Sequence, residues 1–107
     1  MKKQRYRVFR PKSKEKLKGF LDQLFNRTPR DHYMVKIHAQ VLGAEELWAL
    51  LEPYAHKIDW YRKVKSLVFV LDNYDPDEVP EFVVVAPSEL EASDLIDFEE
   101  IERELGF

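Results

Sequence analysis

A run of acidic side chains is the first feature of this sequence of 107 residues that could do chemistry. Carboxylate oxygens are the ligands that hard cations such as Mg²⁺ and Ca²⁺ prefer. Counted from Asp72, however, the sixth and twelfth positions of an EF-hand loop hold Asp77 and Val83 instead of glycine and glutamate. We therefore favour a solvated loop, name no metal ligand, and keep a carboxylate-dependent metal enzyme as a second alternative function. The acids of this run are Asp72, Asp75, Asp77, Glu78 and Glu81.

The histidines His32, His38 and His56 are the next candidates, as metal ligands or as a general base. Six residues of extended chain separate His32 from His38 by roughly 20 Å, which is too far for one metal ion. On an unbroken helix Glu52 and Asp59 would flank His56, but the proline that follows Glu52 disfavours helical geometry there. We expect an ordinary surface histidine at this position and name no catalytic residue, because no partnered nucleophile is visible.

Several kinds of site are excluded because their residues are missing. The chain has no cysteine, which removes disulfides, thiolate catalysis and cysteine-bound zinc. Only three glycines occur, and the phosphate-loop, dinucleotide-binding and nucleophile-elbow patterns are all absent. We expect no cofactor, and we favour a non-enzymatic role while an enzyme with an unfamiliar site stays open.

Two basic segments that contain aromatic residues suggest single-stranded RNA or DNA binding as the first alternative function. Cations hold phosphates, and aromatic rings stack on bases. The sequence pI of about 5.6 lies far below the basic value of a dedicated nucleic-acid binder. The residues that would serve this function are Arg5, Arg7, Arg10, Lys12, Lys63 and Lys65.

The charge of the chain is divided between its two ends. Residues 1–71 hold sixteen Lys and Arg against seven Asp and Glu, which is +9, whereas residues 72–107 hold one Arg against thirteen acids, which is −12. The leading hypothesis is therefore a protein-interaction module, an adaptor or inhibitor-like protein, whose acidic surface binds a partner with a basic surface. If the basic and acidic regions lie against each other instead, their opposite charges pair within the chain and no acidic surface is left for a partner. The expected partner-binding residues are Asp75, Asp77, Glu78, Asp97, Glu99, Glu100 and Glu102.

Hydrophobic periodicity predicts the elements that would position these residues. Strands are expected at 5–10, 33–41, 66–71 and 81–86. Helices are expected from Ser13 to about Asn26 and, after Gly43, either as one kinked helix or as a helix to Leu51 followed by a second one started by Pro53.

The turn-forming residues between the last two strands predict an antiparallel hairpin. Ser88 and Glu91 form a capping box before an acidic helix, whose apolar stripe we expect to complete the core. The stripe consists of Leu95, Phe98, Ile101 and Leu105.

The predicted fold is a single α+β domain over residues 1–107, with 88–107 an acidic C-terminal helical segment. Its element order, β-α-β-α-β-β-α with a mixed four-stranded sheet, matches the minimal thioredoxin-like arrangement, among others, and without cysteine such a scaffold would be redox-dead. No apolar run reaches the length of a secretory leader core or the roughly 20 residues of a membrane span. We therefore expect a cytoplasmic protein with no membrane partner.

Overall fold

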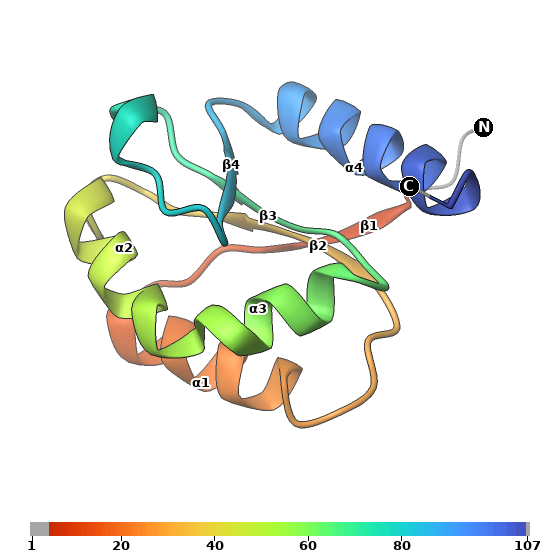
Figure 1. The fold of residues 1–107 in the computed structure, drawn as a ribbon. Helices are drawn as coiled ribbons and strands as arrows, with labels where there is room; N and C mark the ends of the chain where they lie inside the picture. The colour runs from red at the N-terminus through yellow and green to blue at the C-terminus, as the bar shows by residue number, and fades with distance from the viewer. Residues whose placement is uncertain (1–4, 107) are drawn as a thin grey trace.

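Four strands, four α-helices and two short 3-10 turns make up residues 5–106, the part of the chain that the computed structural model describes (Figure 1). The strands and the turns are β1 (Tyr6–Phe9), β2 (His32–Lys36), β3 (Leu67–Val70), β4 (Val84–Ala86), η1 (Glu52–Tyr54) and η2 (Pro76–Glu78). The helices are α1 (Lys14–Leu24), α2 (Ala44–Leu51), α3 (Ala55–Arg62) and α4 (Glu89–Glu104).

The four strands form one sheet in the order β1-β2-β3-β4, and every neighbouring pair is parallel. The expected mixed sheet is therefore wrong, and so is the antiparallel hairpin between its last two strands. The thioredoxin-like arrangement considered above included that hairpin, so the observed sheet does not match it. What remains of the predicted fold is a compact domain of helices on a four-stranded sheet.

The segment 71–83, between β3 and β4, makes a crossover possible where a hairpin was expected. Parallel neighbours need a connection of about a dozen residues or more, and this segment has that length. Its apolar side chains Tyr74, Val79, Phe82 and Val83 belong to the same core cluster as residues of α1, α2 and α3. The chain therefore crosses one face of the sheet and returns to start β4 in the same direction as β3.

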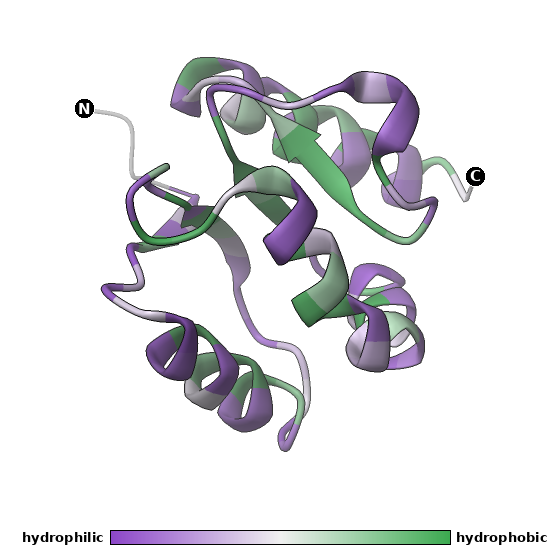
Figure 2. Ribbon diagram, turned by 90° about the vertical axis from the view of Figure 1, so that its left-hand side faces the viewer, coloured by the Kyte–Doolittle hydropathy of each residue, from purple (hydrophilic) through white to green (hydrophobic). Residues whose placement is uncertain are grey.

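The sheet lies between two unequal layers of helices, α1, α2 and α3 on one face and α4 on the other (Figure 1). The larger core lies beneath the three helices and includes Leu17, Leu47, Tyr61 and Phe69. The smaller core, beneath α4, is built by Met34, Val68, Val70, Ala86, Ala92 and Ile96. Figure 2 shows the strands as mostly hydrophobic and the outward sides of the helices as hydrophilic. Because both faces of β3 are covered, all four of its residues are buried.

Local signals in the sequence set the helix boundaries. Ser13 caps α1 by accepting a hydrogen bond from the Lys16 backbone N–H (3.1 Å), and Ser88 caps α4 in the same way. Of the two alternatives at Pro53, the structure has the interrupted one, in which η1 separates α2 from α3. The second strand ends at Lys36 and not at Val41, so the alternation of its last residues did not indicate strand.

The long helix α4 docks through a different side than its apolar residues predicted. Ala92 and Ile96 are fully buried against the sheet, whereas Phe98, Ile101 and Leu105 are 60%, 54% and 64% exposed. The expectation that the apolar stripe completes the core is therefore wrong for these three residues. The small side chain of Ala92 lets the helix approach the sheet closely, and polar side chains form the rest of its inner face. None of the described helices is long and apolar enough to cross a membrane.

Candidate functional site

Buried polar side chains lie where the C-terminal half of α4 crosses the amino ends of the strands. The hydroxyl of Ser66, just before β3, donates to Glu99 (2.6 Å) and accepts from Arg103 (3.2 Å). Arg103 also donates to the backbone carbonyl of Arg62 (2.9 Å). Ser66 is fully buried, so no substrate can reach its hydroxyl. This network holds α4 to the sheet and is not a nucleophile site.

His32, at the start of β2, belongs to the same buried region. Its Nδ1 accepts a hydrogen bond from the Ser66 backbone N–H (2.8 Å), so a neutral ring carries its proton on Nε2, which lies 3.4 Å from a carboxylate oxygen of Glu100. Burial lowers the pKa of His32 below its ordinary value of 6.5, although the hydrogen bond and charge of Glu100 oppose that effect. Nδ1 therefore links β2 to the residue before β3, whereas Nε2 lies near α4 without forming a well-aligned hydrogen bond to any described residue.

Three of the seven acids expected to bind a partner form internal ion pairs instead. Glu100 pairs with Arg5, which also lies 4.0 Å from Asp97, and Glu99 lies 3.5 Å from Arg62. Burial raises the pKa of Glu100, but the His32 hydrogen bond and the Arg5 charge outweigh it, so the pKa ends below the usual value. The basic and acidic regions of the chain thus meet beneath α4. Glu102, also on α4, has no ion pair with another described residue.

The other acids of that group, Asp75, Asp77 and Glu78, lie at η2 in the crossover and are exposed. The Asp75 side chain accepts a hydrogen bond from the Asp77 backbone N–H (2.9 Å) and so shapes the turn. Among the described residues none of the three forms an ion pair. A hollow of about 420 Å³ separates this turn from the start of α2. Its charged lining residues are Glu45, Glu46, Asp75 and Glu78.

A second hollow, of about 460 Å³, lies between β4 and α4. Its apolar lining comes from Val85, Ala86, Pro87, Leu95 and Phe98, and its acidic lining from Glu91 and Asp94. Tyr74 lines this hollow and also the one beside η2, so the two hollows border the same side chain. We refer to the hollow between β4 and α4 as the β4 groove.

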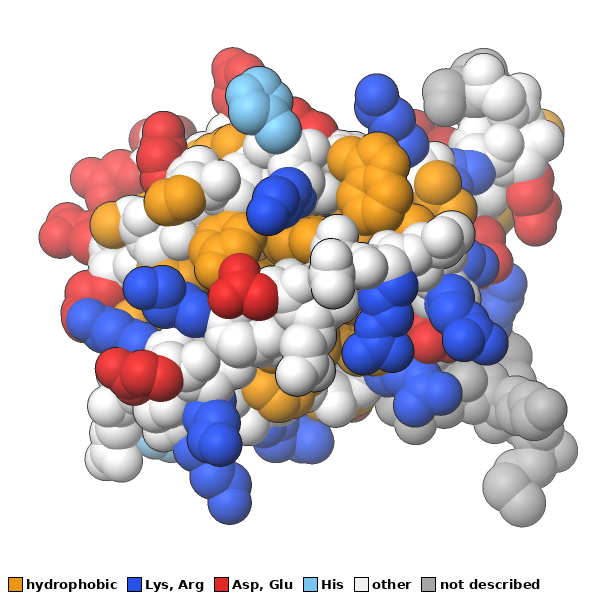
Figure 3. Space-filling model, turned by 90° about the horizontal axis from the view of Figure 1, so that it is seen from below, with side chains coloured by type: hydrophobic (Ala, Val, Ile, Leu, Met, Phe, Trp, Pro, Cys, Tyr) orange, Lys and Arg blue, Asp and Glu red, His pale blue; other side chains and the backbone are white. Residues whose placement is uncertain are grey.

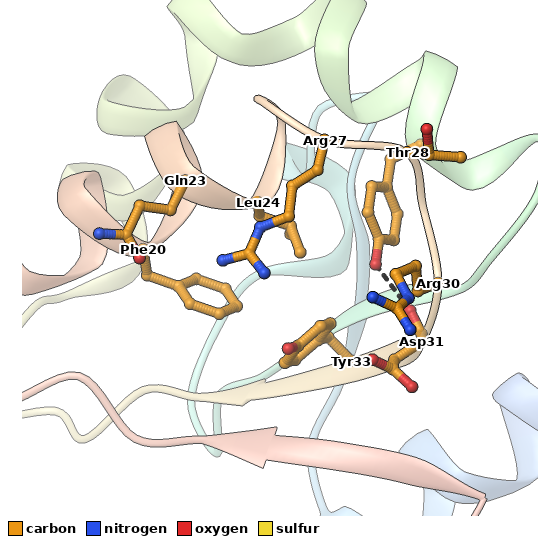
Figure 4. Close-up of a pocket in the computed structure, with 9 residues that line it drawn as sticks. Phe20, Gln23, Leu24, Arg27, Thr28, Arg30, Asp31 and Tyr33 are labelled. Atoms are coloured by element: carbon orange, nitrogen blue, oxygen red, sulfur yellow. Dashed lines mark hydrogen bonds between the residues drawn. The ribbon is translucent and has the colours of Figure 1, made fainter.

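Another pocket, of about 180 Å³, lies between the end of α1 and the start of β2 (Figure 4). It contains Arg27 and Arg30 among aromatic side chains, a composition that suits an anion. Two of its polar residues already have partners, because the Tyr61 hydroxyl donates to the Asp31 carbonyl (2.7 Å) and the Asp31 carboxylate pairs with Arg7 (3.1 Å). Pockets for organic ligands usually have about 300–1,000 Å³. We assign it no ligand.

The six cations of the nucleic-acid alternative are not brought together. Arg5 and Arg7 form ion pairs with Glu100 and Asp31. Arg10 and Lys12 follow β1, whereas Lys63 and Lys65 precede β3, so these two pairs lie at opposite ends of the parallel strands. Figure 3, which views the α1–α3 layer, shows Lys and Arg at both ends of this face, with acidic side chains more frequent toward the end with α2.

The carboxyl ends of the strands, where open parallel sheets commonly bind ligands, form a further hollow of about 300 Å³. It contains Lys36, His38 and Asp72, but Lys36 already pairs with Glu89 (3.0 Å), and this contact lowers the pKa of Glu89. The strand order has no reversal that would open a crevice between two helices. Within residues 5–106 no three His, Asp or Glu side chains are arranged to hold a metal ion.

The sequence analysis missed four residues of the β4 groove: Tyr74, Val85, Glu91 and Asp94. The last two were detectable, because spacings of three and four residues place them on the same flank of a helix as Leu95 and Phe98. Tyr74 was an aromatic residue among turn formers, and Val85 becomes an edge residue only in the parallel sheet. No protein-family model, curated protein or solved structure that we searched matches this chain, so the geometry alone supports a functional assignment.

Proposed function

We propose that this protein is a non-enzymatic interaction module, adaptor or inhibitor-like, that binds a basic partner through the acidic η2 turn and the β4 flank of α4. One observation carries the proposal: Tyr74 lines both the hollow beside η2 and the β4 groove, and each of the two has acidic lining residues. Acids distant in the sequence thus border one surface. Asp75, Glu78, Glu91 and Asp94 have no ion pairs with described residues, so their charge is available to a partner. Glu46, in contrast, pairs with Lys14 (2.6 Å).

The apolar residues of this surface give a second reason for the proposal. Phe98 is 60% exposed and lies beside half-buried Leu95, and both line the β4 groove. Interfaces commonly combine an apolar centre with a charged rim. Of the seven acids first expected to bind the partner, the proposal keeps Asp75, Asp77, Glu78 and Glu102. Asp97, Glu99 and Glu100 are assigned to holding α4, because they contact arginines of this chain.

The test is charge reversal on this surface with a matched reversal elsewhere. The test variant carries Asp77→Lys, Glu78→Lys and Glu91→Lys, and the control carries the same number of reversals on the other helical layer, Glu15→Lys, Glu52→Lys and Asp59→Lys. All six acids are exposed, so both variants should fold. Each immobilised protein is incubated with lysate of the source organism, and retained proteins are identified by mass spectrometry.

We expect the wild type and the control to retain the same basic proteins and the test variant to lose them. Since both variants carry the same net charge, a non-specific charge effect would remove the partners from both. Equal capture by all three proteins would disprove the role of this surface.

A further inference from the structure

The strand β4 is an open edge of the sheet. Its only neighbour among the described strands is β3, and β4 is the last strand in the order. The Leu71 backbone N–H donates to the Ala86 carbonyl (3.0 Å), so the polar groups of Ala86 point toward β3. Because successive residues of a strand point their N–H and C=O groups to opposite sides, those of Val85 point away from the sheet. An added strand would find one donor and one acceptor there.

This open edge forms the floor of the β4 groove. Val85 of this edge, Tyr74 of the crossover and Phe98 of α4 all line the groove. Tyr74 packs on the core of the α1–α3 face and α4 covers the other face, so these two side chains reach the edge from opposite faces of the sheet. The groove therefore lies beside the edge at which a further strand would pair. An extended chain in this position would place alternate side chains toward Tyr74 and toward Phe98.

The charges of the groove select among the segments that could occupy it. Glu91 and Asp94 line the groove, and Asp75 and Glu78 line the neighbouring hollow beside η2, which shares Tyr74 with the groove. Two copies of this chain pairing β4 with β4 would bring these carboxylates together, and like charges across an interface oppose association. A segment with Lys or Arg at alternate positions would bring its cations to Asp75 and Glu78 on the Tyr74 side, while its remaining side chains would contact Leu95 and Phe98 on the α4 side.

We infer that the β4 edge receives, as an added strand, an extended segment of a partner protein in which basic and apolar residues alternate. This inference rests on the proposed function and names the partner segment that the acidic surface recognises. Main-chain hydrogen bonds provide affinity in such strand addition, and the pockets for alternate side chains provide specificity.

The added strand pairs over a short length. The Val83 N–H is already bonded to the Pro80 carbonyl (3.0 Å), and Pro87 has no N–H to offer. Val85 therefore provides the central contact of the ladder, and the side chains of the segment must supply the rest of the affinity. A short edge of this kind also limits pairing with arbitrary chains.

The experiment uses a synthetic peptide of alternating Lys and Val, binding to the full protein at physiological salt. One peptide carries N-methyl groups on its odd residues and another on its even residues, so the two have equal charge and composition but lack donors on opposite edges. We expect one methylated peptide to bind like the unmodified peptide and the other to bind about tenfold more weakly or not at all, because its donor to Val85 is lost. Hydrogen exchange at the Val85 amide should slow on binding.

The outcomes separate this inference from the proposed function. Equal binding of all three peptides, lost in the Asp77→Lys, Glu78→Lys, Glu91→Lys variant, would overturn strand addition and leave an acidic interaction surface. No binding of any peptide would overturn the strand segment, while the proposed function would still be decided by the lysate capture. Concentration-dependent self-association that protects the Val85 amide would show that a second copy of this chain occupies the groove, and would overturn a separate partner.

Discussion

At the scale of single residues, the buried polar groups under α4 serve stability. His32 and Ser66 connect two neighbouring strands, and Glu99, Glu100 and Arg103 connect those strands to the helix. A buried polar group that loses its partner costs about 1–3 kcal/mol. Such a network fixes the position of α4, and with it the width of the β4 groove.

The first prediction concerns the pH dependence that His32 gives to the fold. Its pKa in the folded state lies below 6.5, so as the pH falls the unfolded chain takes up the proton first. Stability from this group is therefore complete above about pH 6.5 and is lost as the pH falls through the lowered pKa of the folded state. The charged groups around the ring are Glu100, which favours the proton, and Lys65 and Arg103, which oppose it. Urea unfolding of the wild type should show this loss.

The variants His32→Phe and His56→Gln test the assignment. His32→Phe should lower the free energy of unfolding by about 1–3 kcal/mol at pH 8, because the Ser66 N–H loses its acceptor, and should remove most of the pH dependence just below 6.5. His56 is exposed, so His56→Gln should leave the pH profile unchanged. If His32→Phe keeps the wild-type slope in this range, another group causes it.

At the scale of elements, the sequence predicted helices better than strand pairing, for physical reasons. Helix boundaries depend on neighbouring residues, so Ser13 and Ser88 as caps and Pro53 as an interruption are readable locally. The direction of β4 depends on whether residues 71–83 cross the sheet, which is a tertiary event. The continuous apolar run of Phe82 to Ala86 is typical of a strand in a parallel sheet. The turn-forming residues that precede it, however, predict an antiparallel hairpin.

The second prediction distinguishes the two apolar sides of α4. Ile96 is fully buried in the smaller core, whereas Phe98 is 60% exposed in the β4 groove. Ile96→Ala should therefore cost about 2–5 kcal/mol of folding free energy, and Phe98→Ala no more than about 0.5 kcal/mol. Both values come from urea unfolding curves. An equal cost for the two substitutions would mean that α4 docks through the stripe that the sequence analysis favoured.

At the scale of the whole molecule, the charge split between the two ends of the chain has two different fates. Part of it is neutralised, because Arg5 and Lys36 from the basic region pair with Glu100 and Glu89 of α4. Of the acids without an ion pair, Asp75, Asp77 and Glu78 lie at η2, and Glu91 and Asp94 line the β4 groove. Internal ion pairs therefore neutralise the acids on the inner flank of α4. The acids on the flank that faces β4 keep their charge.

The third prediction follows from the distribution of the basic side chains. Two of the six cations that could contact phosphates form ion pairs, and the other four lie at opposite ends of the strands, so they offer no continuous track for a phosphate backbone. We expect no binding of a mixed single-stranded oligonucleotide pool at physiological salt, measured by fluorescence anisotropy. At low salt, any weak binding should have a log–log salt slope of about −1 or less in magnitude, since each phosphate contact contributes about −0.7.

A control variant makes that result specific to the charge arrangement. Glu100 pairs with Arg5, so Glu100→Gln removes that ion pair while keeping the shape of the side chain and leaves only the longer contact of Arg5 with Asp97 (4.0 Å). If internal pairing is what suppresses phosphate binding, this variant should bind the pool more strongly than the wild type at low salt. A log–log salt slope in the wild type that corresponds to several phosphate contacts would instead support nucleic acid as the partner. The ion pairs with α4 would then be too weak to keep these cations from binding phosphates.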